Sequence, residues 1–587
     1  MRINSPGLRP VGRTVDLLVE GLPVTAHAGD SVAAALIDAG LRVCRLTGSG
    51  QPRGVFCGMG VCQECVMTID GARSRACMTF VRDGMNVAPL REEELLAAPA
   101  PHPLEPVVLR PELLVVGGGP AGLAAAAAAA EAGVEVVLVD ERAKPGGQFY
   151  KQPSEAHHVI EPELDKQYRE GRALIARVEA AGVRRLAGVE VWAAAAPREL
   201  YALGGGRAYA LRAERLVVAT GAYERGVPVP GWTLPGFMTT GAAQTLMRAY
   251  QVLPGRRVLV TGNGPLNLQV AAEIVRDGGA VVALCELAAF RSPLRAPAAA
   301  RMALATPALM AEGARLAAVI HRARVPVLTR WALVRAEGEG AVERAVVARI
   351  DASGCAVDGT ERVFEVDAVC AGYGFLPSNE LARTLGLAHR FDPALGQLAA
   401  VADDRGRSSL DGVWVAGDSG GTGGARLARA VGFLAGLDAS RSLGRTPGTE
   451  LEGEEREAER ERDRSRRFQA GLAALFAAPR LVDQLAQPDT LVCRCEEVTL
   501  AAVIASFEDG AGAIGAVKRV TRAGMGRCQG RYCASILAAI AARRGAAELT
   551  EEDWFAPAPP FKPIPVAEAA RAIAALAPAA DVKERMG

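Results

Sequence analysis

The architecture of this chain follows from residues 113–141, LLVVGGGPAGLAAAAAAAEAGVEVVLVDE. Short runs of Leu and Val flank a glycine turn and an alanine-rich segment, which predicts strand, turn, helix and strand. Three glycines occupy the G-x-G-x-x-G positions that let a pyrophosphate approach the backbone at a helix N-terminus: Gly117, Gly119 and Gly122. Asp140 follows Gly117 by 23 residues, where a carboxylate accepts hydrogen bonds from ribose hydroxyls, and Glu141 is the neighbouring alternative. The stretch therefore predicts a Rossmann-like dinucleotide-binding unit.

Three further segments resemble motifs of flavoproteins with two dinucleotide-binding domains. LVVATGA (216–222) is similar to their strand ending in ATG, and GVWVAGD (412–418) to their distal motif, whose aspartate holds the ribitol chain. GGQ (146–148) stands where the first domain of that class wraps the flavin. The ordered set predicts FAD, bound with help from Gly147, Gln148, Thr220, Gly221, Gly417 and Asp418.

A second dinucleotide-type segment, RVLVTGNGPLN, begins at residue 257. Gly262 and Gly264 match the glycine pattern, but Asn267 replaces the third glycine. The position of the ribose acid, 23 residues after Gly262, is Cys285, followed by Glu286. We expect the fold of an NAD(P)-type domain, with three possibilities open: NAD(P)H, another adenine nucleotide, or a vestigial site.

The first group of cysteines has the spacing Cys57-x4-Cys62-x2-Cys65-x11-Cys77. A [2Fe–2S] cluster needs four thiolates, two per iron, and the glycines in this loop let the backbone approach. Asp-Gly at 70–71 predicts a hairpin that returns the fourth cysteine beside the third. Zinc sites usually show paired CxxC halves, so the spacing favours [2Fe–2S] over zinc.

The second group has the spacing Cys493-x-Cys495-x32-Cys528-x4-Cys533, with Cys528 expected at a helix start. It resembles the bacterioferritin-associated ferredoxin module, which holds a [2Fe–2S] cluster. A zinc knuckle is the alternative.

Composition limits the functional classes. Lys and Arg number 67 against 66 Asp and Glu, so the net charge of +1 gives no basic surplus for nucleic acid. The N-terminus shows no apolar signal segment, and no stretch is expected to be a transmembrane segment. Twelve cysteines in a cytosolic chain are not expected to form structural disulfides. We expect a cytoplasmic location, with peripheral association at the inner membrane left open.

The 587 residues are expected to form an α/β multidomain protein. A Pro-rich stretch at 98–108 and a mixed-charge run at 449–467 mark linkers. The expected segments are a β-grasp [2Fe–2S] ferredoxin-like domain (1–100), the first half of an FAD-binding domain (108–240), an NAD(P)-type Rossmann domain (241–370), the second half of the FAD-binding domain (371–445), a charged linker helix (446–487), a C-terminal [2Fe–2S] domain (488–545) and a tail (546–587).

Together these motifs resemble the FAD and iron–sulfur (alpha) subunits of heteromeric bacterial amine and imino-acid dehydrogenases. That group includes opine oxidase, D-hydroxyproline dehydrogenase, dye-linked proline dehydrogenase, hydrogen cyanide synthase and sarcosine oxidase alpha. The resemblance implies that C–N oxidation of an amino acid, imino acid or opine occurs on a partner, an amino-acid-oxidase-like FAD subunit. Electrons would then pass through this chain to a quinone or another acceptor. It also implies FMN at a subunit interface as a candidate cofactor.

Electron transfer within such a complex is the leading hypothesis, because a flavin accepts a hydride while each [2Fe–2S] cluster carries one electron. The alternatives are a self-sufficient NAD(P)H-dependent reductase and a scaffold with structural or sensing clusters. No catalytic acid or base is assigned, and His157 and His158 are interpreted as a surface pair. Residues 113–440 contain no CxxC or CxxxxC pair, which excludes disulfide reduction beside the flavin.

Overall fold

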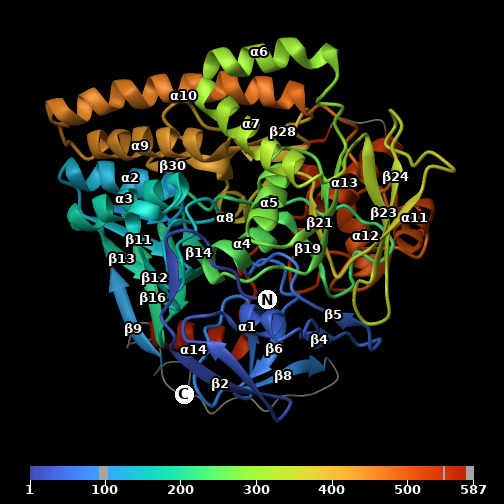
Figure 1. The fold of residues 1–587 in the computed structure, drawn as a ribbon. Coiled ribbons are helices and arrows are strands. Elements are labelled where there is room, and N and C mark those ends of the chain that lie inside the picture. The colour runs from blue at the N-terminus through green and yellow to red at the C-terminus, as the bar shows by residue number, and fades with distance from the viewer. Residues whose placement is uncertain (92–103, 546–548, 577–587) are drawn as a thin grey trace.

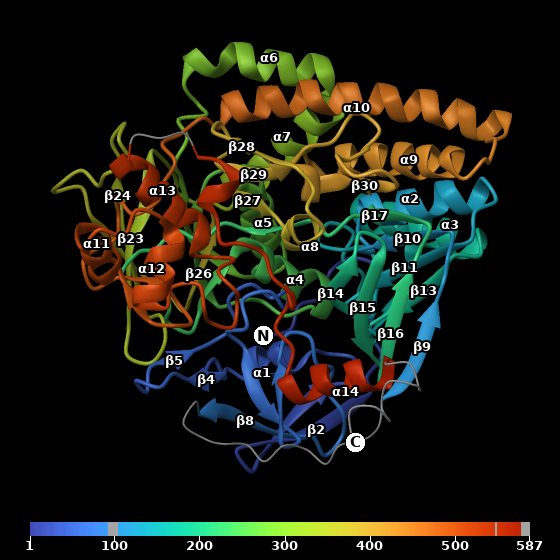
Figure 2. The same cartoon turned by 180° about the vertical axis from the view of Figure 1, so that it is seen from behind.

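The computed structural model describes residues 1–91, 104–545 and 549–576 (Figure 1). The boundary expected at residue 100 and two stretches of the expected tail, 546–548 and 577–587, lie outside the described residues. Two parallel sheets form the centre of the molecule. The N-terminal strands and the last helix, α14 (Val566–Leu576), lie side by side beneath these sheets in both views (Figures 1 and 2).

A mixed sheet and one helix, α1 (Val32–Asp38), form the N-terminal domain, as expected for a β-grasp unit. Ser31 caps α1, because its hydroxyl accepts a hydrogen bond from the Ala34 N–H at 3.2 Å. Asp70 and Gly71 both have positive φ, which confirms the two-residue hairpin turn. The strands are β2 (Thr14–Val19), β3 (Leu22–His27), β4 (Arg45–Leu46), β5 (Pro52–Arg53), β6 (Val66–Ile69), β7 (Ala72–Arg75) and β8 (Asn86–Arg91).

The first parallel sheet has the strand order β13-β11-β10-β17-β30, so a strand from residues 413–415 completes a unit that begins 300 residues earlier. Two of the helices in this unit pack closely against each other, because a Cβ at Gly432 would lie 2.2 Å from the Ala121 carbonyl oxygen. The elements are β10 (Leu113–Val116), α2 (Pro120–Glu131), β11 (Val136–Asp140), α3 (Lys166–Ala180), β13 (Arg184–Ala187), β17 (Arg215–Val218), β30 (Val413–Val415) and α9 (Gly424–Ser442).

The second parallel sheet has the order β19-β26-β20-β21-β22. It begins with β19, before residue 241, and takes all of β26, past residue 370. The elements are β19 (Phe237–Thr239), α4 (Thr240–Tyr250), β20 (Arg257–Gly262), α5 (Pro265–Arg276), β21 (Ala280–Glu286), α6 (Ala296–Ala305), α7 (Pro307–Arg322), β22 (Val327–Thr329) and β26 (Ala368–Gly372).

Smaller sheets and short helices connect these units. The strands are β1 (Leu8–Pro10), β9 (Glu105–Leu109), β12 (His157–Val159), β14 (Glu190–Ala196), β15 (Glu199–Gly204), β16 (Arg207–Arg212), β18 (Ala222–Glu224), β23 (Trp331–Glu337), β24 (Arg344–Arg349), β25 (Arg362–Glu365), β27 (Phe375–Pro377), β28 (His389–Asp392) and β29 (Gln397–Ala400). The short helices are α8 (Glu380–Thr384), η1 (Glu161–Glu163), η2 (Pro293–Arg295), η3 (Gly417–Gly420) and η4 (Glu551–Asp553).

The charged run forms the long helix α10 (Thr449–Leu475), which lies across α9 and α6 at the top of Figure 1. The C-terminal domain follows with β31 (Leu491–Cys493), β32 (Val498–Thr499), α11 (Leu500–Glu508), α12 (Ile514–Thr521) and α13 (Ala534–Gly545). The tail then runs back to the first half of the molecule, where α14 packs on β9 and β16. Among the described helices, none is long and apolar enough to span a membrane.

Candidate functional site

The first glycine turn leaves no room for a side chain at Gly117 or Gly122. Gly117 has φ +110°, and a Cβ there would lie 2.3 Å from the Ala219 carbonyl oxygen. A Cβ at Gly122 would lie 1.8 Å from the Gly117 carbonyl oxygen, so glycine is required for α2 to pack against β10. Gly119 precedes α2 directly, so the helix N-terminus faces the turn.

Asp140 borders this turn and Glu141 does not. The Asp140 carboxylate accepts hydrogen bonds from the Gly118 N–H at 2.7 Å and the Arg142 N–H at 2.8 Å. Glu141 forms an ion pair with Lys562 of the tail. Burial opposes its ionisation, but the charges of Lys562 and Arg75 outweigh burial and lower the pKa of Glu141 to about 2. This arrangement favours Asp140 as the ribose ligand.

The remaining flavin motifs gather at the same edge of the first sheet. The Gly146 N–H donates to the Gly118 carbonyl oxygen at 2.8 Å, so the GGQ segment lies on the glycine turn. A Cβ at Gly147 would lie 2.7 Å from the Gly119 Cα, and a Cβ at Gly417 would lie 2.8 Å from the Ala121 Cβ. Glycine backbone therefore lines this edge, where a dinucleotide is bound in such folds.

Two polar residues of the motifs are fixed by short hydrogen bonds. The Thr220 hydroxyl donates to the Ser378 carbonyl oxygen at 2.6 Å. The partly buried Asp418 carboxylate accepts from the Gly423 and Gly424 N–H groups at 2.9 and 3.2 Å, at the start of α9. Burial nevertheless raises the pKa of Asp418. The second Asp418 oxygen remains available for a ribitol hydroxyl, so these residues fit FAD.

At the second glycine turn, the acidic residue is not at the position that the sequence predicts. The predicted equivalent of Asp140 was Cys285, but that thiol is buried in the core. Glu286 instead accepts a hydrogen bond from the Gly264 N–H at 3.0 Å, one position later in its turn than Gly118, which donates to Asp140. The reason is a register shift between β20 and β21 after Val258, which adds one residue to β21.

Two contacts at this turn distinguish it from the first. The Asn267 amide is buried and donates to the Gly372 carbonyl oxygen at 2.8 Å, while its oxygen accepts from the Thr240 hydroxyl at 2.8 Å. The Asn263 amide donates to the Phe476 carbonyl oxygen at 3.0 Å, so the end of α10 lies on the turn. Burial raises the pKa of Glu286 to about 8. A nucleotide at this turn would therefore contact the end of α10 as well as the glycine turn.

The first cysteine quartet is buried: Cys57, Cys62 and Cys65 lie in the loop between β5 and β6, and Cys77 follows β7. Hydrogen bonds from Cys62 and from the backbone N–H groups of Met59, Cys62 and Val61 lower the pKa of Cys57 to about 6, in spite of burial. The Glu64 N–H is directed at the Cys62 sulfur at 3.4 Å. Such N–H groups stabilise thiolates, so the loop fits a [2Fe–2S] cluster.

The second quartet is also gathered by the fold. The Cys495 sulfur lies 3.8 Å from that of Cys493 and 3.9 Å from that of Cys528. Cys533, and not Cys528 as expected, immediately precedes helix α13, because the intervening turn is not helical. Within the described ranges no three His, Cys, Asp or Glu residues are placed around a single metal ion. Neighbouring thiols suit a two-iron cluster, which takes two thiolates per iron.

Three parts of the chain match models of known protein families. Residues 111–432 match the model for "Pyridine nucleotide-disulphide oxidoreductase". The chain belongs to this family. Residues 12–92 match "2Fe-2S iron-sulfur cluster binding domain" and residues 491–543 match "BFD-like [2Fe-2S] binding domain". The chain is therefore an FAD-dependent member of the pyridine nucleotide-disulphide oxidoreductase family with a [2Fe–2S] domain at each side.

Several proteins similar to this chain are named as subunits. An opine oxidase subunit of Rhizobium meliloti (strain 1021) is 31% identical over 78% of this chain and 98% of its own length. Hydrogen cyanide synthase subunit HcnB of Pseudomonas aeruginosa is 32% identical over 78% and 97%. A separate subunit, HcnA of P. aeruginosa, is 44% identical over 82 residues, 14% of this chain and 79% of its own. The chain is thus a member of the flavin and iron–sulfur subunit group that the sequence motifs resemble.

One solved structure extends the likeness over almost the whole fold. L-proline dehydrogenase from P. horikoshii covers 98% of this chain and 100% of its own, with a TM-score of 0.69 and 21% identity. This agrees with a two-dinucleotide-domain flavoprotein carrying a domain at each end.

Sequence reasoning missed a pair of buried charges near the flavin motifs. The Lys151 ammonium donates to the Gln244 side chain at 2.9 Å, and Glu224 accepts from the Gly241 N–H at 2.8 Å. Burial lowers the pKa of Lys151 to about 7 and raises that of Glu224 to about 7. The position of Lys151, three residues after Gln148, was the only available signal. The histidine pair was partly wrong, because His157 is buried in β12.

Sequence reasoning also missed that the two cysteine quartets meet. One cavity is lined by residues from both: Cys62, Glu64, Cys493, Arg494, Cys495, Cys528, Tyr532 and Cys533. Glu64, Arg494 and Tyr532 each adjoin a predicted ligand in sequence, but nothing in the sequence connects them to one another.

Proposed function

We propose that this chain is the flavin and iron–sulfur electron-transfer subunit of a heteromeric dehydrogenase or oxidase. The observation that carries the proposal is the shared cavity of the two cysteine quartets, beside a fold with an FAD-type edge. Bound flavin supplies the conversion of a two-electron hydride into single electrons. The chain's own residues hold that flavin through the glycine turn and Asp418, and hold two one-electron centres through eight cysteines.

We infer that the C–N bond of an amino acid, imino acid or opine is oxidised on a partner, an amino-acid-oxidase-like FAD subunit. The names opine oxidase and hydrogen cyanide synthase support this, since each relative is one subunit of an enzyme. The likeness to the separate HcnA subunit supports fusion of a small [2Fe–2S] subunit to the FAD subunit. A quinone or another carrier would receive the electrons, and FMN would bind at the subunit interface.

A self-sufficient NAD(P)H-dependent reductase is the second candidate. Glu286 favours it, because it accepts a hydrogen bond from a backbone N–H of the second glycine turn, Gly264, as Asp140 accepts one from Gly118 of the first. The contact of Phe476 with Asn263 counts against it. NAD(P) or another adenine nucleotide would bind beside Gly262, Gly264 and Glu286.

An anaerobic titration of the purified, cofactor-replete chain with NADH and NADPH separates the two candidates. Absorbance reports the flavin and EPR reports the clusters. We expect no bleaching with either nucleotide and full reduction with dithionite. Rapid bleaching with reduced-cluster signals would instead establish the reductase, and oxidation of a substrate without any partner would overturn the proposed subunit role.

A further inference from the structure

The cavity between the cysteine quartets joins the two ends of the chain. It is lined on one side by Cys62 and Glu64 of the N-terminal domain. The other side contains all four cysteines of the C-terminal domain, together with Arg494 and Tyr532. A ligand of one candidate cluster therefore faces the complete ligand set of the other, without a strand or helix between them.

Tyr532 lines this cavity and packs on Phe56 of the N-terminal domain. Phe56 precedes Cys57 and Tyr532 precedes Cys533, and their ring centroids are 5.2 Å apart in an edge-on arrangement. Both side chains are buried, and the Tyr532 hydroxyl has no hydrogen-bond partner within the described parts of the chain. The ring therefore packs here as an apolar surface, and its hydroxyl is not needed for the contact.

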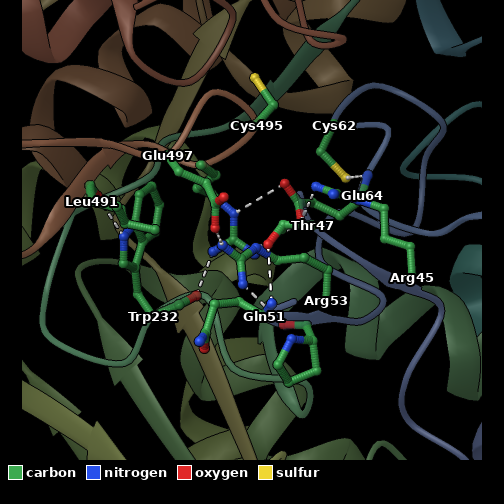
Figure 3. Close-up of polar contacts among 12 residues, drawn as sticks. Arg45, Thr47, Gln51, Arg53, Cys62, Glu64, Trp232, Leu491, Cys495 and Glu497 are labelled. Atoms are coloured by element: carbon green, nitrogen blue, oxygen red, sulfur yellow. Dashed lines mark hydrogen bonds and ion pairs between the residues drawn. The ribbon is translucent and has the colours of Figure 1, made fainter. Parts of the chain in front are cut away.

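A cluster of buried charges joins the same two domains (Figure 3). Glu64 lies 3.3 Å from Arg45, 3.8 Å from Arg53 and 3.7 Å from Arg494. We call these four residues the buried arginine cluster; each has 5% or less of its surface exposed. Figure 3 shows Cys62 and Cys495 on one side of it.

Arg494 also fixes the orientation of the C-terminal domain. Its guanidinium carbon lies 3.9 Å from the Phe56 ring centroid and 4.7 Å from that of Trp232. The Trp232 indole N–H donates to the Leu491 carbonyl oxygen at 2.8 Å. The guanidinium groups of Arg45, Arg53 and Arg494 place positive charge beside the cavity. Positive charge stabilises centres built from thiolates and favours their reduced form, because reduction adds negative charge.

We propose that the two [2Fe–2S] centres form one redox unit, in which an electron passes directly between them across this cavity. Tyr532, packed on Phe56, and the buried arginine cluster are the positioning residues that keep the two domains in contact. With both clusters bound by the eight cysteines, one electron would leave the reduced centre and one would be gained by the oxidised centre, with no bond formed or broken and no proton transferred. The inference rests on the proposed electron-transfer function and specifies its internal route.

The test uses the purified, cofactor-replete chain with dithionite alone, so it requires no partner and no substrate. EPR spectra are recorded at a potential where one cluster is reduced and again when both are reduced. We expect dipolar splitting and faster spin relaxation in the second sample. Two superimposed spectra with unchanged relaxation would overturn the proposal, and would leave the proposed subunit role untouched.

Two substitutions test the positioning role of Tyr532. After rapid mixing with substoichiometric dithionite, freeze-quench EPR follows how the electrons distribute between the clusters. Tyr532→Phe keeps the ring, so redistribution should match the unaltered chain. Tyr532→Leu removes the ring, so redistribution should slow. Equal rates in all three proteins would overturn the role of Tyr532, and the two-potential experiment decides the proposal if Tyr532→Leu does not fold.

Discussion

Replacing Glu64 by glutamine removes the only negative charge of the buried arginine cluster. Burial alone would raise the pKa of Glu64, but the charges of Arg494, Arg45 and Arg53 outweigh burial and lower it. Glu64 is thus ionised in the folded protein. Glu64→Gln keeps the shape of the side chain and removes the buried carboxylate that Arg45, Arg53 and Arg494 face.

Loss of this carboxylate should lower the free energy of unfolding. Removing one partner of a buried ion pair destabilises a protein by about 3–5 kcal/mol. Glu497→Gln is the matched control, because Glu497 also pairs with Arg53, at 3.0 Å, but keeps 26% of its side chain exposed. A partly exposed pair of this kind contributes about 0–1 kcal/mol. Both substitutions replace a glutamate that pairs with Arg53 by glutamine. The structure therefore predicts that they lower the free energy of unfolding by amounts that differ by several kcal/mol.

The assay is urea unfolding followed by the visible circular dichroism of the clusters. That signal reports the cluster domains, whereas a global signal would average several domains that do not unfold together. Glu64→Gln should lower the midpoint well below that of the unaltered chain, and Glu497→Gln should change it little. If both variants unfolded at the same urea concentration, the claim that Glu64 balances the buried arginines would be wrong.

Four further predictions concern the other sites. Burial raises the pKa of Glu286 from 4.5 to about 8, so the folded state retains a proton that the unfolded state loses. This group alone should lower the stability by about 5 kcal/mol between pH 4.5 and 8. Glu286→Gln should remove that contribution from pH-dependent unfolding and leave the contribution of Glu224. Cys528→Ser should lose one of two clusters in iron analysis and EPR, whereas Cys370→Ser, at a buried thiol outside both quartets, should keep both. Asp418→Ala should weaken FAD retention on gel filtration, because its carboxylate fixes the start of α9. Lys151→Met should remove any transition near pH 7 from the flavin absorbance, since burial sets the pKa of Lys151 to about 7; a transition that persists would assign it to another group.

Local features of the fold could be predicted from the sequence. The glycine turn at Gly117, the hairpin at Asp70 and the cap at Ser31 each depend on residues within a few positions of one another. In such cases conformational preference and spacing are enough. The cysteine quartets belong with them, because their ligands repeat a known spacing.

Two features could not be predicted, for different physical reasons. The acidic residue at the second turn is Glu286 and not the predicted position 285, because a register shift places one extra residue in β21. The contact of Glu64 with Arg494 depends on where the central sheets place the two ends of the chain. Such a contact has no local signal, because charged residues are usually exposed and a buried cluster is evident only after folding.

The flavoprotein body holds both loops that form the cavity. The Thr239 N–H, at the start of α4, donates to the Phe56 carbonyl oxygen at 2.9 Å. The Tyr223 hydroxyl, from β18, donates to the Arg531 carbonyl oxygen at 3.1 Å. The first contact fixes the N-terminal loop and the second fixes the C-terminal loop. The two anchoring residues, Thr239 at the end of β19 and Tyr223 in β18, are close in sequence.

This anchoring explains why charges can be buried where apolar side chains would stabilise more. A buried ion cluster contributes little net stability, since desolvation offsets the attraction between its members. It does oppose misalignment, because any displacement leaves a guanidinium group without its carboxylate. Joining both domains to one chain also makes their contact intramolecular, which avoids most of the entropy cost of association. The buried arginine cluster therefore specifies where the two cysteine quartets meet, while the central sheets and the covalent chain supply the stability that this contact lacks.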